Sequence, residues 1–209
     1  MKRSTLAVFD IDGTILKGPP SFLTLLKFKF SGAKLHQSDI EPDPISPLAR
    51  KLDNLDDYGV FPLFFVQKPK KEIIKIINKL DKQQNTLFIL SGRGKKLLQN
   101  ITLNQLKKHD LLKYFDKIFL KPGNFKSSTT WKFHALKEFT QDYKKVYLFE
   151  NDLITSLRIG HYAKIHKLPI EIILIPSLET HSLILKFLNL TPKLLSDNKV
   201  QIFQPNLKF

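Results

Sequence analysis

The sequence predicts an α/β protein built around a parallel sheet, and three features of the chain lead to that prediction. Short apolar runs alternate with longer segments whose apolar residues recur at helical spacing. Several of the apolar runs end in acidic residues or in Ser-Gly, which suits buried strands whose carboxyl ends line a site. The length of 209 residues fits one domain with one substantial core. Strands that alternate with helices imply right-handed crossovers and therefore a parallel sheet.

The expected strands and helices follow one another as βα units. Residues 70–83 illustrate the helical pattern, because Ile73 and Ile77 fall on one apolar stripe. Three hydroxyl residues at 128–130 offer N-caps for a helix that begins near Trp131. The expected strands are 6–9, 86–90, 117–120, 146–149 and 170–175, and the expected helices are 70–83, 95–108, about 131 onward, 152–165 and 178–188.

One long segment interrupts this alternation. The region of about 18–69 holds seven prolines and two acidic clusters between the first strand and the next helix. A connection of this length inside a compact domain is usually functional or disordered. We interpret it as a small cap or lid within a single domain of residues 1–209. The stretch of about 190–209 is a C-terminal extension, for which a strand, a docking segment and a disordered arm all stay open.

The charge balance is strongly basic. Lys and Arg number 34 against 19 Asp and Glu, which gives a formal net charge of +15. This excess favours a polyanionic partner, although a lysine-rich surface alone produces the same value. The chain has no cysteine, which excludes disulfides and is compatible with an intracellular location, cytoplasmic or nuclear. No apolar run approaches the roughly 20 residues of a membrane span, and the apolar stretch after the basic start is too short for a secretory signal.

Two acidic residues close the first expected strand. Asp10 and Asp12 stand one residue apart directly after residues 6–9, and Gly13 permits a sharp turn there. Two carboxylates in this position are costly unless they bind a cation or stabilise developing charge. The alternative is an acidic turn that merely ends a strand, and the specific string Asp-Ile-Asp-Gly-Thr argues against it.

This string, residues 10–14, resembles the first motif of the haloacid dehalogenase-like (HAD) phosphohydrolase superfamily, Asp-x-Asp-Gly-Thr. The resemblance implies a three-layer Rossmann-like core with a parallel sheet and a small cap insertion after the first strand. It also implies that Asp10 is a nucleophile that forms an aspartyl-phosphate, and that Asp12 is the general acid and base. Thr14 is then expected to contact substrate. An Asp at the second acidic position favours a phosphatase over the superfamily's ATPase branch, which lacks it.

The end of the second expected strand extends the resemblance. Ser91 matches the superfamily's second motif, a Ser or Thr that hydrogen-bonds the phosphoryl group, and Gly92 and Arg93 are further candidates for substrate binding. The third element is a lysine that neutralises phosphoryl charge, and in many members it opens the helix before the fourth strand. The candidates for this lysine, in order of preference, are Lys132 and then Lys121 or Lys126.

The end of the fourth expected strand suggests a metal site. The superfamily completes a Mg²⁺ site at this point, and Mg²⁺ prefers oxygen ligands while keeping several waters. Asp10, the carbonyl of Asp12 and one side chain from the following loop would suffice. Asn151 and Asp152 are the favoured ligands in that loop, and Glu150 is the alternative. Asn151 departs from the usual adjacent acids, and a neutral ligand would weaken metal binding.

A narrower resemblance rests on residues 86–152. The order of Leu-Ser-Gly-Arg, Leu-Lys-Pro, a Ser/Thr-rich run before Trp-Lys-Phe, and Tyr-Leu-Phe-Glu is similar to the HAD branch called the Swiss Army Knife RNA repair-like domain. Together with the charge, it predicts a Mg²⁺-dependent phosphatase that acts on phosphorylated ends of RNA or DNA. Two alternatives stay open. One is a phosphatase for small metabolites such as nucleotides or sugar phosphates. The other is a weakly active or inactive HAD fold that binds nucleic acid or protein.

Overall fold

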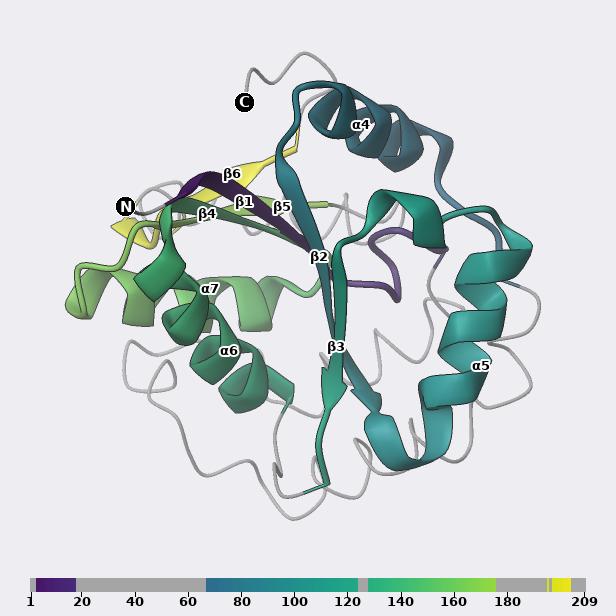
Figure 1. Ribbon diagram of the computed structural model, residues 1–209. Helices are drawn as coiled ribbons and strands as arrows, with labels where there is room; N and C mark the ends of the chain where they lie inside the picture. Colours follow the sequence, from purple (N-terminus) through teal and green to yellow (C-terminus); the bar gives the residue numbers. More distant parts are fainter. Residues whose placement is uncertain (1–2, 18–66, 124–127, 176–194, 196, 204–209) are drawn as a thin grey trace.

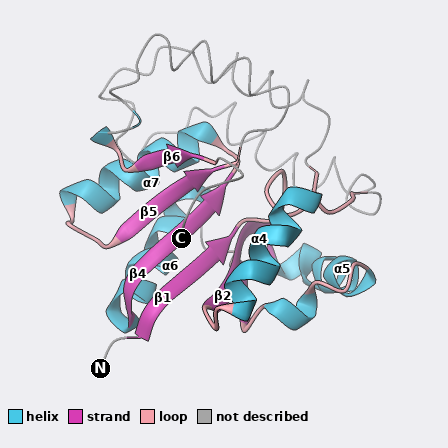
Figure 2. Cartoon of the chain, turned by 90° about the horizontal axis from the view of Figure 1, so that it is seen from above, coloured by secondary structure: helices cyan, strands magenta, loops and turns pink. Residues whose placement is uncertain are grey.

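A sheet of six parallel strands organises the structure, a computed structural model that describes residues 3–17, 67–123, 128–175, 195 and 197–203 (Figure 1). The strand order is β3-β2-β1-β4-β5-β6, and Figure 2 shows the strands running side by side. The central strand is β1 (Arg3–Phe9), between β2 (Thr86–Gly94) and β4 (Tyr143–Glu150). The outer strands are β3 (Lys117–Lys121), β5 (Ile170–Leu174) and β6 (Val200–Ile202).

The two faces of the sheet are buried by different helices. Leu6 and Val8 of β1 pack into a cluster with α6 (Ser128–Asp142) and α7 (Leu153–Ile165). Ala7 and Phe9 alternate with them and face the opposite side, which α4 (Lys71–Lys82) and α5 (Lys95–Lys108) cover. Figure 1 shows this separation of the helix pairs across the sheet. The predicted three-layer α/β core with a parallel sheet is confirmed.

The register brings three strand ends to one edge. Phe9, the last residue of β1, lies opposite Ile89 of β2 and Phe149 of β4. The Phe9 and Phe149 rings stack, with 4.3 Å between their centroids. The chain therefore leaves β1 and β4 at neighbouring points, and the polar residues of β2 begin at Ser91, two residues past this level.

The described elements differ from the predicted ones mainly at their ends. β2 runs to Gly94 and not to residue 90, because residues 91–94 continue to pair with β3 through a shift in register. Inside this irregular stretch the Ser91 hydroxyl accepts the Arg93 backbone N–H at 3.2 Å. A short 3₁₀ turn, η2 (Leu112–Tyr114), precedes β3, and part of the C-terminal extension forms β6. Most of the predicted cap at 18–69 and the predicted helix at 178–188 lie outside the described residues.

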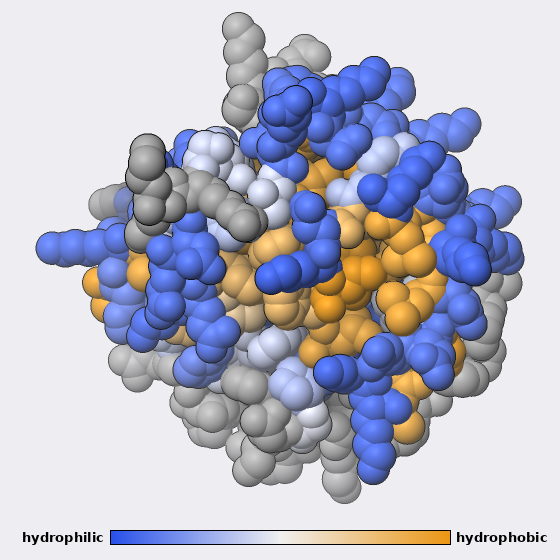
Figure 3. Space-filling model, in the orientation of Figure 1, coloured by the Kyte–Doolittle hydropathy of each residue, from blue (hydrophilic) through white to orange (hydrophobic). Residues whose placement is uncertain are grey.

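Hydrophilic residues surround the face of the molecule drawn in Figure 3, and hydrophobic residues occupy its middle, over β2 and β3. Large apolar side chains that are well exposed include Leu97, at 46%, and Ile165, at 58%. In the part of the chain that the structure describes, no helix is both long and apolar enough to cross a membrane.

Candidate active site

The site residues gather at the edge where β1, β2 and β4 end. Asp10 follows β1 directly, and its backbone N–H donates to the Phe149 carbonyl at 3.0 Å, which extends the pairing of β1 with β4 by one residue. Ser91 lies in the irregular end of β2, and Glu150 is the last residue of β4. Lys132 comes from the second turn of α6. Residues far apart in the sequence therefore meet at one point because parallel strands share an edge.

Lys132 lies between two carboxylates. Its ammonium donates to Asp10 Oδ1 at 2.7 Å and to Glu150 Oε2 at 2.5 Å. All three side chains are buried, with Glu150 only 1% exposed. The other oxygen of Glu150, Oε1, accepts the backbone N–H groups of Asn151 at 2.9 Å and Asp152 at 3.1 Å. Glu150 thus fixes the lysine and the turn after β4 together.

Burial and neighbouring charges shift the pKa values of Asp10 and Lys132 in opposite directions. Burial raises the pKa of Asp10 to about 7, and the Lys132 ammonium works against that rise. For Lys132, burial lowers the pKa, but Asp10 and Glu150 outweigh it and hold the pKa above its usual range. A charged Lys132 beside Asp10 is the arrangement that stabilises negative charge on a group held by Asp10.

The Asp12 carboxylate pairs with Arg93, whereas Asp10 pairs with Lys132. Arg93 donates to Asp12 twice, from Nε to Oδ2 and from Nη2 to Oδ1, both at 2.7 Å. Gln67 Nε2 also donates to Asp12 Oδ1, at 3.0 Å. The Asp12 side chain keeps 25% of its surface exposed, whereas that of Arg93 keeps 2%. The structure therefore places Arg93, a predicted substrate-binding residue, against Asp12.

The remaining predicted substrate contacts are Thr14, in the loop after β1, and Ser91 and Gly92, near the end of β2. Ser91 is 1% exposed and Thr14 is fully buried. Gly13 adopts φ +79°, and a Cβ atom there would lie 2.2 Å from the Asn151 amide, so only glycine fits beneath that side chain. Gly92 faces α6 closely, since a Cβ atom would lie 2.7 Å from Ser128 Oγ.

The loop after β4 has one unexpected orientation. Asp12 O and Glu150 Oε1 face the same end of the Asn151 amide, at 2.6 and 3.2 Å. Both atoms are acceptors, so the NH₂ end must point at them and donate. Asp152 caps α7, because its Oδ1 accepts the Thr155 backbone N–H at 2.6 Å.

The oxygen donors at this edge fit Mg²⁺ in type but carry little charge. Asp10 Oδ2 and Asp152 Oδ2 are hard oxygen atoms, while the Asp12 carbonyl and the Asn151 amide oxygen could both reach a metal only if the amide turned its NH₂ end away from that carbonyl. Glu150 has both oxygens engaged by other groups. Within the described residues no cluster of three or more Asp, Glu, His or Cys side chains stands ready for a metal. A metal held here would rest on one or two carboxylates, a backbone carbonyl and an amide.

Comparisons with known proteins identify the fold. No family model and no curated protein matches the sequence. Among solved structures, the chain is similar to a predicted phosphatase from Clostridium acetobutylicum, with a TM-score of 0.56 and 13% identity over 96% of this chain and 94% of that one. It is also similar to a hydrolase of the haloacid dehalogenase-like family, SP0104 from Streptococcus pneumoniae, with a TM-score of 0.51 and 13% identity over 97% and 95%. This chain has the haloacid dehalogenase-like fold. In that fold the edge occupied by Asp10 is the carboxyl edge of the sheet, where ligands bind in open α/β sheets.

Several polar residues at this edge were missed by the sequence reasoning. Gln67 and Lys70 lie where the chain returns to the loop after β1, and the Lys70 ammonium donates to the Gly13 carbonyl. Thr102 and Gln105 of α5 are buried at 0% and 6% exposure, and they hold Arg93. Their spacing offered a signal, because two polar residues three apart share one helix face. Of the lysine candidates, Lys132 is the one that the structure places against Asp10, while Lys121 ends β3 and Lys126 lies outside the described residues.

Proposed function

We propose that this protein is a Mg²⁺-dependent HAD-type phosphomonoesterase that works through an aspartyl-phosphate on Asp10. The observation that carries the proposal is the contact of Lys132 Nζ with Asp10 Oδ1, with Asp12 two residues further along the same loop. Lys132 holds one oxygen of Asp10 and leaves Oδ2 to attack. The comparisons support the fold of such an enzyme, and the chemistry rests on these side chains.

The proposed reaction has two displacements at phosphorus. Asp10 Oδ2 attacks in line, and the bond to the leaving oxygen breaks as Asp12 gives that oxygen its proton. The products of this step are an alcohol and an acyl phosphate on Asp10. Asp12, now ionised, takes a proton from a water molecule as the water attacks phosphorus, and the bond from Asp10 to phosphorus breaks. Inorganic phosphate leaves, and both aspartates return to their starting forms.

The surrounding residues stabilise charge in both steps. Lys132 stays protonated and offsets the negative charge that gathers on the phosphoryl oxygens. Ser91 would donate its hydroxyl hydrogen to the phosphoryl group, and Thr14 and Gly92 are the further proposed contacts of the substrate. A bound Mg²⁺, held by Asp10, the Asp12 carbonyl and Asn151 or Asp152, would add charge neutralisation and orient the phosphoryl oxygens.

Replacement of the nucleophile tests this proposal. Asp10→Asn keeps the size of the side chain and its contact with Lys132 but cannot form an acyl phosphate. We expect it to abolish Mg²⁺-dependent hydrolysis of a generic phosphate ester. Retained activity in a folded Asp10→Asn protein would show that another group is the nucleophile.

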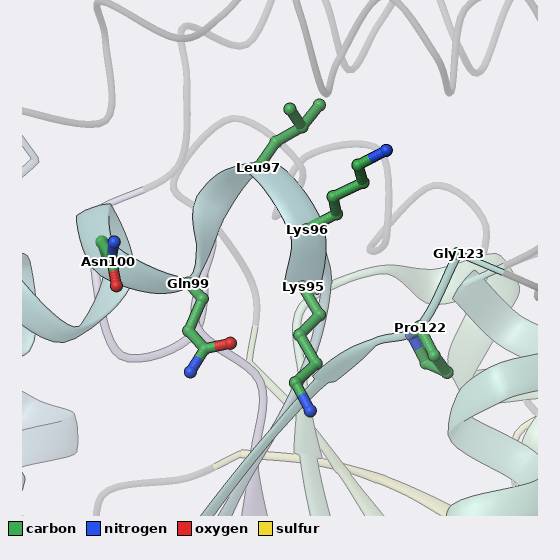
Figure 4. A pocket seen from close by; sticks show the side chains of 7 residues that line it. All are labelled: Lys95, Lys96, Leu97, Gln99, Asn100, Pro122 and Gly123. Atoms are coloured by element: carbon green, nitrogen blue, oxygen red, sulfur yellow. The ribbon is translucent and has the colours of Figure 1, made fainter.

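A polynucleotide end is the substrate class that we favour. The net charge of +15 supports it, since phosphate contacts dominate the affinity for nucleic acids. A cavity of about 450 Å³ lies on the same sheet edge, between the start of α5 and the end of β3, and two lysines and two amides line it. Figure 4 shows Lys95 and Gln99 reaching to the same side of this cavity, with Lys96 extending away from them. These residues suit the phosphates next to a terminal phosphate held at Asp10.

A substrate screen separates this class from small metabolites. Nucleotides, sugar phosphates and oligonucleotides with 5′- or 3′-phosphates are compared at low and high salt, with Asp10→Asn as the control. For oligonucleotides we expect turnover that falls steeply with salt, because binding releases counterions. Salt-insensitive turnover of small esters, without binding of oligonucleotides, would favour the metabolite phosphatase.

One observation favours a second function, a binding module with weak or no catalysis. Asn151 stands where the superfamily usually has an acid, and its amide donates to the Asp12 carbonyl. A crystal soaked in Mg²⁺ discriminates the two functions. An ion bound between Asp10 and the loop of residues 150–152 supports the enzyme, and an Asn151 amide that keeps its place in high Mg²⁺ supports the module.

A further inference from the structure

We propose that Arg93 is a positioning residue for Asp12, and that Gln67, Thr102 and Gln105 orient its guanidinium for this task. The inference rests on the proposed function, in which Asp12 donates a proton to the leaving oxygen. Oδ1 accepts two N–H groups and Oδ2 accepts one, so the free lone pair of Oδ2 is the one that carries this proton. The inference assigns Arg93 a different role from phosphate binding, and it gives roles to three buried polar residues that have none so far.

The contact between Arg93 and Asp12 has the geometry of a fork. Nε and Nη2 each donate to a different oxygen of the carboxylate, both at 2.7 Å. Such paired charge-assisted bonds fix the plane and direction of the carboxylate as well as its distance. Gln67 Nε2 adds a third donor at Oδ1, 3.0 Å away. Rotation of the Asp12 side chain would break all three bonds.

Every N–H group of the guanidinium has an acceptor inside the protein. Nη1 donates to Thr102 Oγ1 at 3.1 Å and to Gln105 Oε1 at 2.9 Å. Nη2 donates to Gln67 Oε1 at 3.0 Å as well as to Asp12. With Nε on Asp12, these bonds use all the donors that an arginine carries. A substrate phosphate would have to displace one of them, so this placement argues against a phosphate contact.

The residues behind Arg93 are themselves held in one orientation. Gln105 Nε2 donates to Gln67 Oε1 at 3.1 Å, and His109 Nε2 lies 3.0 Å from the Gln67 carbonyl oxygen. Each glutamine therefore has its amide orientation set by partners at both ends. Thr102, Gln105 and Gln67 are 0%, 6% and 6% exposed. Burial of so many polar groups rarely adds stability compared with apolar packing, which points to a role in positioning.

The nucleophile and the proton donor are thus held from opposite faces of the sheet. Lys132 reaches Asp10 from α6, which packs on one face. Arg93 is anchored to α5, which packs on the other. Asp10 and Asp12 belong to one short loop, so without separate anchors nothing would keep their carboxylates directed at different oxygens of one phosphate ester. The Arg93 cluster supplies the second anchor.

Leaving-group dependence tests the inference. A general acid matters for an alkyl phosphate, whose alkoxide is a poor leaving group, and hardly matters for 2,4-dinitrophenyl phosphate. We expect Arg93→Lys to reduce kcat/KM on glycerol phosphate by about 100-fold and on the dinitrophenyl ester by less than about 10-fold. Gln105→Leu keeps the volume of the side chain and should give the same pattern with a smaller loss. Asp12→Asn is the reference for the pattern, and Asn104→Ala, exposed on the same helix, is the matched control.

Two results would overturn the inference. If Arg93→Lys and Gln105→Leu lowered kcat/KM equally on both esters, the cluster would have only a structural role. A rise of more than about 10-fold in the dissociation constant for inorganic phosphate, measured by calorimetry in Mg²⁺, would show that Arg93 contacts the phosphate.

A spectroscopic measurement keeps this test separate from the proposed function. If the wild-type protein hydrolyses neither ester, the proposed function fails, but the Arg93 Nε–H signal in a ¹⁵N spectrum still reports on the cluster. We expect Asp12→Asn and Gln105→Leu to shift that signal and Asn104→Ala to leave it in place. A signal that Gln105→Leu does not move would contradict the inference whatever the activity.

Discussion

Glu150 binds the Lys132 ammonium with one carboxylate oxygen and the start of its own following loop with the other. The bond to Lys132 is 2.5 Å long, and the backbone N–H groups of Asn151 and Asp152 reach the second oxygen at 2.9 and 3.1 Å. Glu150, which the sequence offered as the alternative metal ligand after Asn151 and Asp152, instead ties α6 to the end of β4. The direction in which Lys132 points at Asp10 depends on this carboxylate.

We therefore expect Glu150→Gln to destabilise the protein strongly. The glutamine oxygen can still accept the backbone N–H groups, but its NH₂ group then faces the Lys132 ammonium, donor against donor. Asp10 still neutralises Lys132, so the cost is that of a lost charge-assisted hydrogen bond and an unsatisfied buried donor, about 2–3 kcal/mol, and the free energy of unfolding in urea measures it. Glu171→Gln is the control, because its pair with Lys145 at 3.0 Å leaves both side chains more than a third exposed, 34% and 41%. That change should cost less than about 1 kcal/mol, and a similar cost for both variants would contradict the prediction.

The charges buried around Asp10 predict that replacing Asp10 with a neutral residue stabilises the protein. Two carboxylates share one ammonium, and burial raises the pKa of Asp10 to about 7 from 3.8. The folded protein therefore binds this proton more tightly than the unfolded chain does. The stabilisation from it is complete below pH 3.8 and is lost as the pH rises through about 7.

Asp10→Asn should consequently raise the Tm at pH 8 by about 2–4 °C for each kcal/mol regained. The difference from wild type should shrink as the pH is lowered from 8 toward 5. Differential scanning fluorimetry across that range measures it, with Asp81→Asn on the exposed side of α4 as the control. A Tm difference that grows toward acid pH would show that the pKa of Asp10 is shifted downward.

The sequence predicted the parts of this site that are local. Short apolar runs located the strands, and acids at strand ends located Asp10, Asp12 and the loop after β4, because parallel strands share a carboxyl edge. It could not predict contacts between residues that are far apart in the sequence and meet only in the folded chain. Gln67 meets Asp12 across 55 positions, and nothing in its neighbours in the sequence marks it.

Competing uses of one side chain were the second obstacle. The sequence position of Asp152 suits a metal ligand and a helix cap equally well. In the structure its Oδ1 accepts the Thr155 backbone N–H and caps α7. The sequence predicts that Arg93 binds phosphate, because a guanidinium directly after Ser-Gly at a strand end is suited to that contact. Only the positions of Thr102 and Gln105 in space show that its donors are already used.

The Asn151 amide predicts how Mg²⁺ affinity depends on this position. Asn151→Asp would direct a carboxylate oxygen at Asp12 O and Glu150 Oε1, which now lie 2.6 and 3.2 Å from the amide. Three oxygens that close repel one another unless a cation lies among them. We expect Mg²⁺ to bind this variant at least about 10-fold more tightly than wild type, with lower stability in the absence of Mg²⁺.

Calorimetric titration with Mg²⁺ and the rise of Tm with its concentration both measure this change. Asn104→Asp, the same substitution at an exposed position of α5, is the control and should bind Mg²⁺ as wild type does. Unchanged affinity in Asn151→Asp would remove residue 151 from the metal site.

Gly160 lies inside α7 at the point where the chain before β6 crosses it. Alanine is favoured over glycine in a helix interior by about 1 kcal/mol, so helix propensity alone predicts that Gly160→Ala stabilises the protein. A Cβ atom at this position, however, would lie 1.9 Å from the Asn198 carbonyl oxygen, which is backbone and cannot move aside as a side chain does.

We expect the variant to lose about 1–3 kcal/mol in urea unfolding. The loss should be accompanied by faster hydrogen exchange at Ile172, whose N–H donates to the Lys199 carbonyl beside β6 at 3.2 Å. Gly123→Ala is the matched control, because nothing lies within 4 Å of its Cβ position. If Gly160→Ala were as stable as Gly123→Ala, the close packing of β6 against α7 would be wrong.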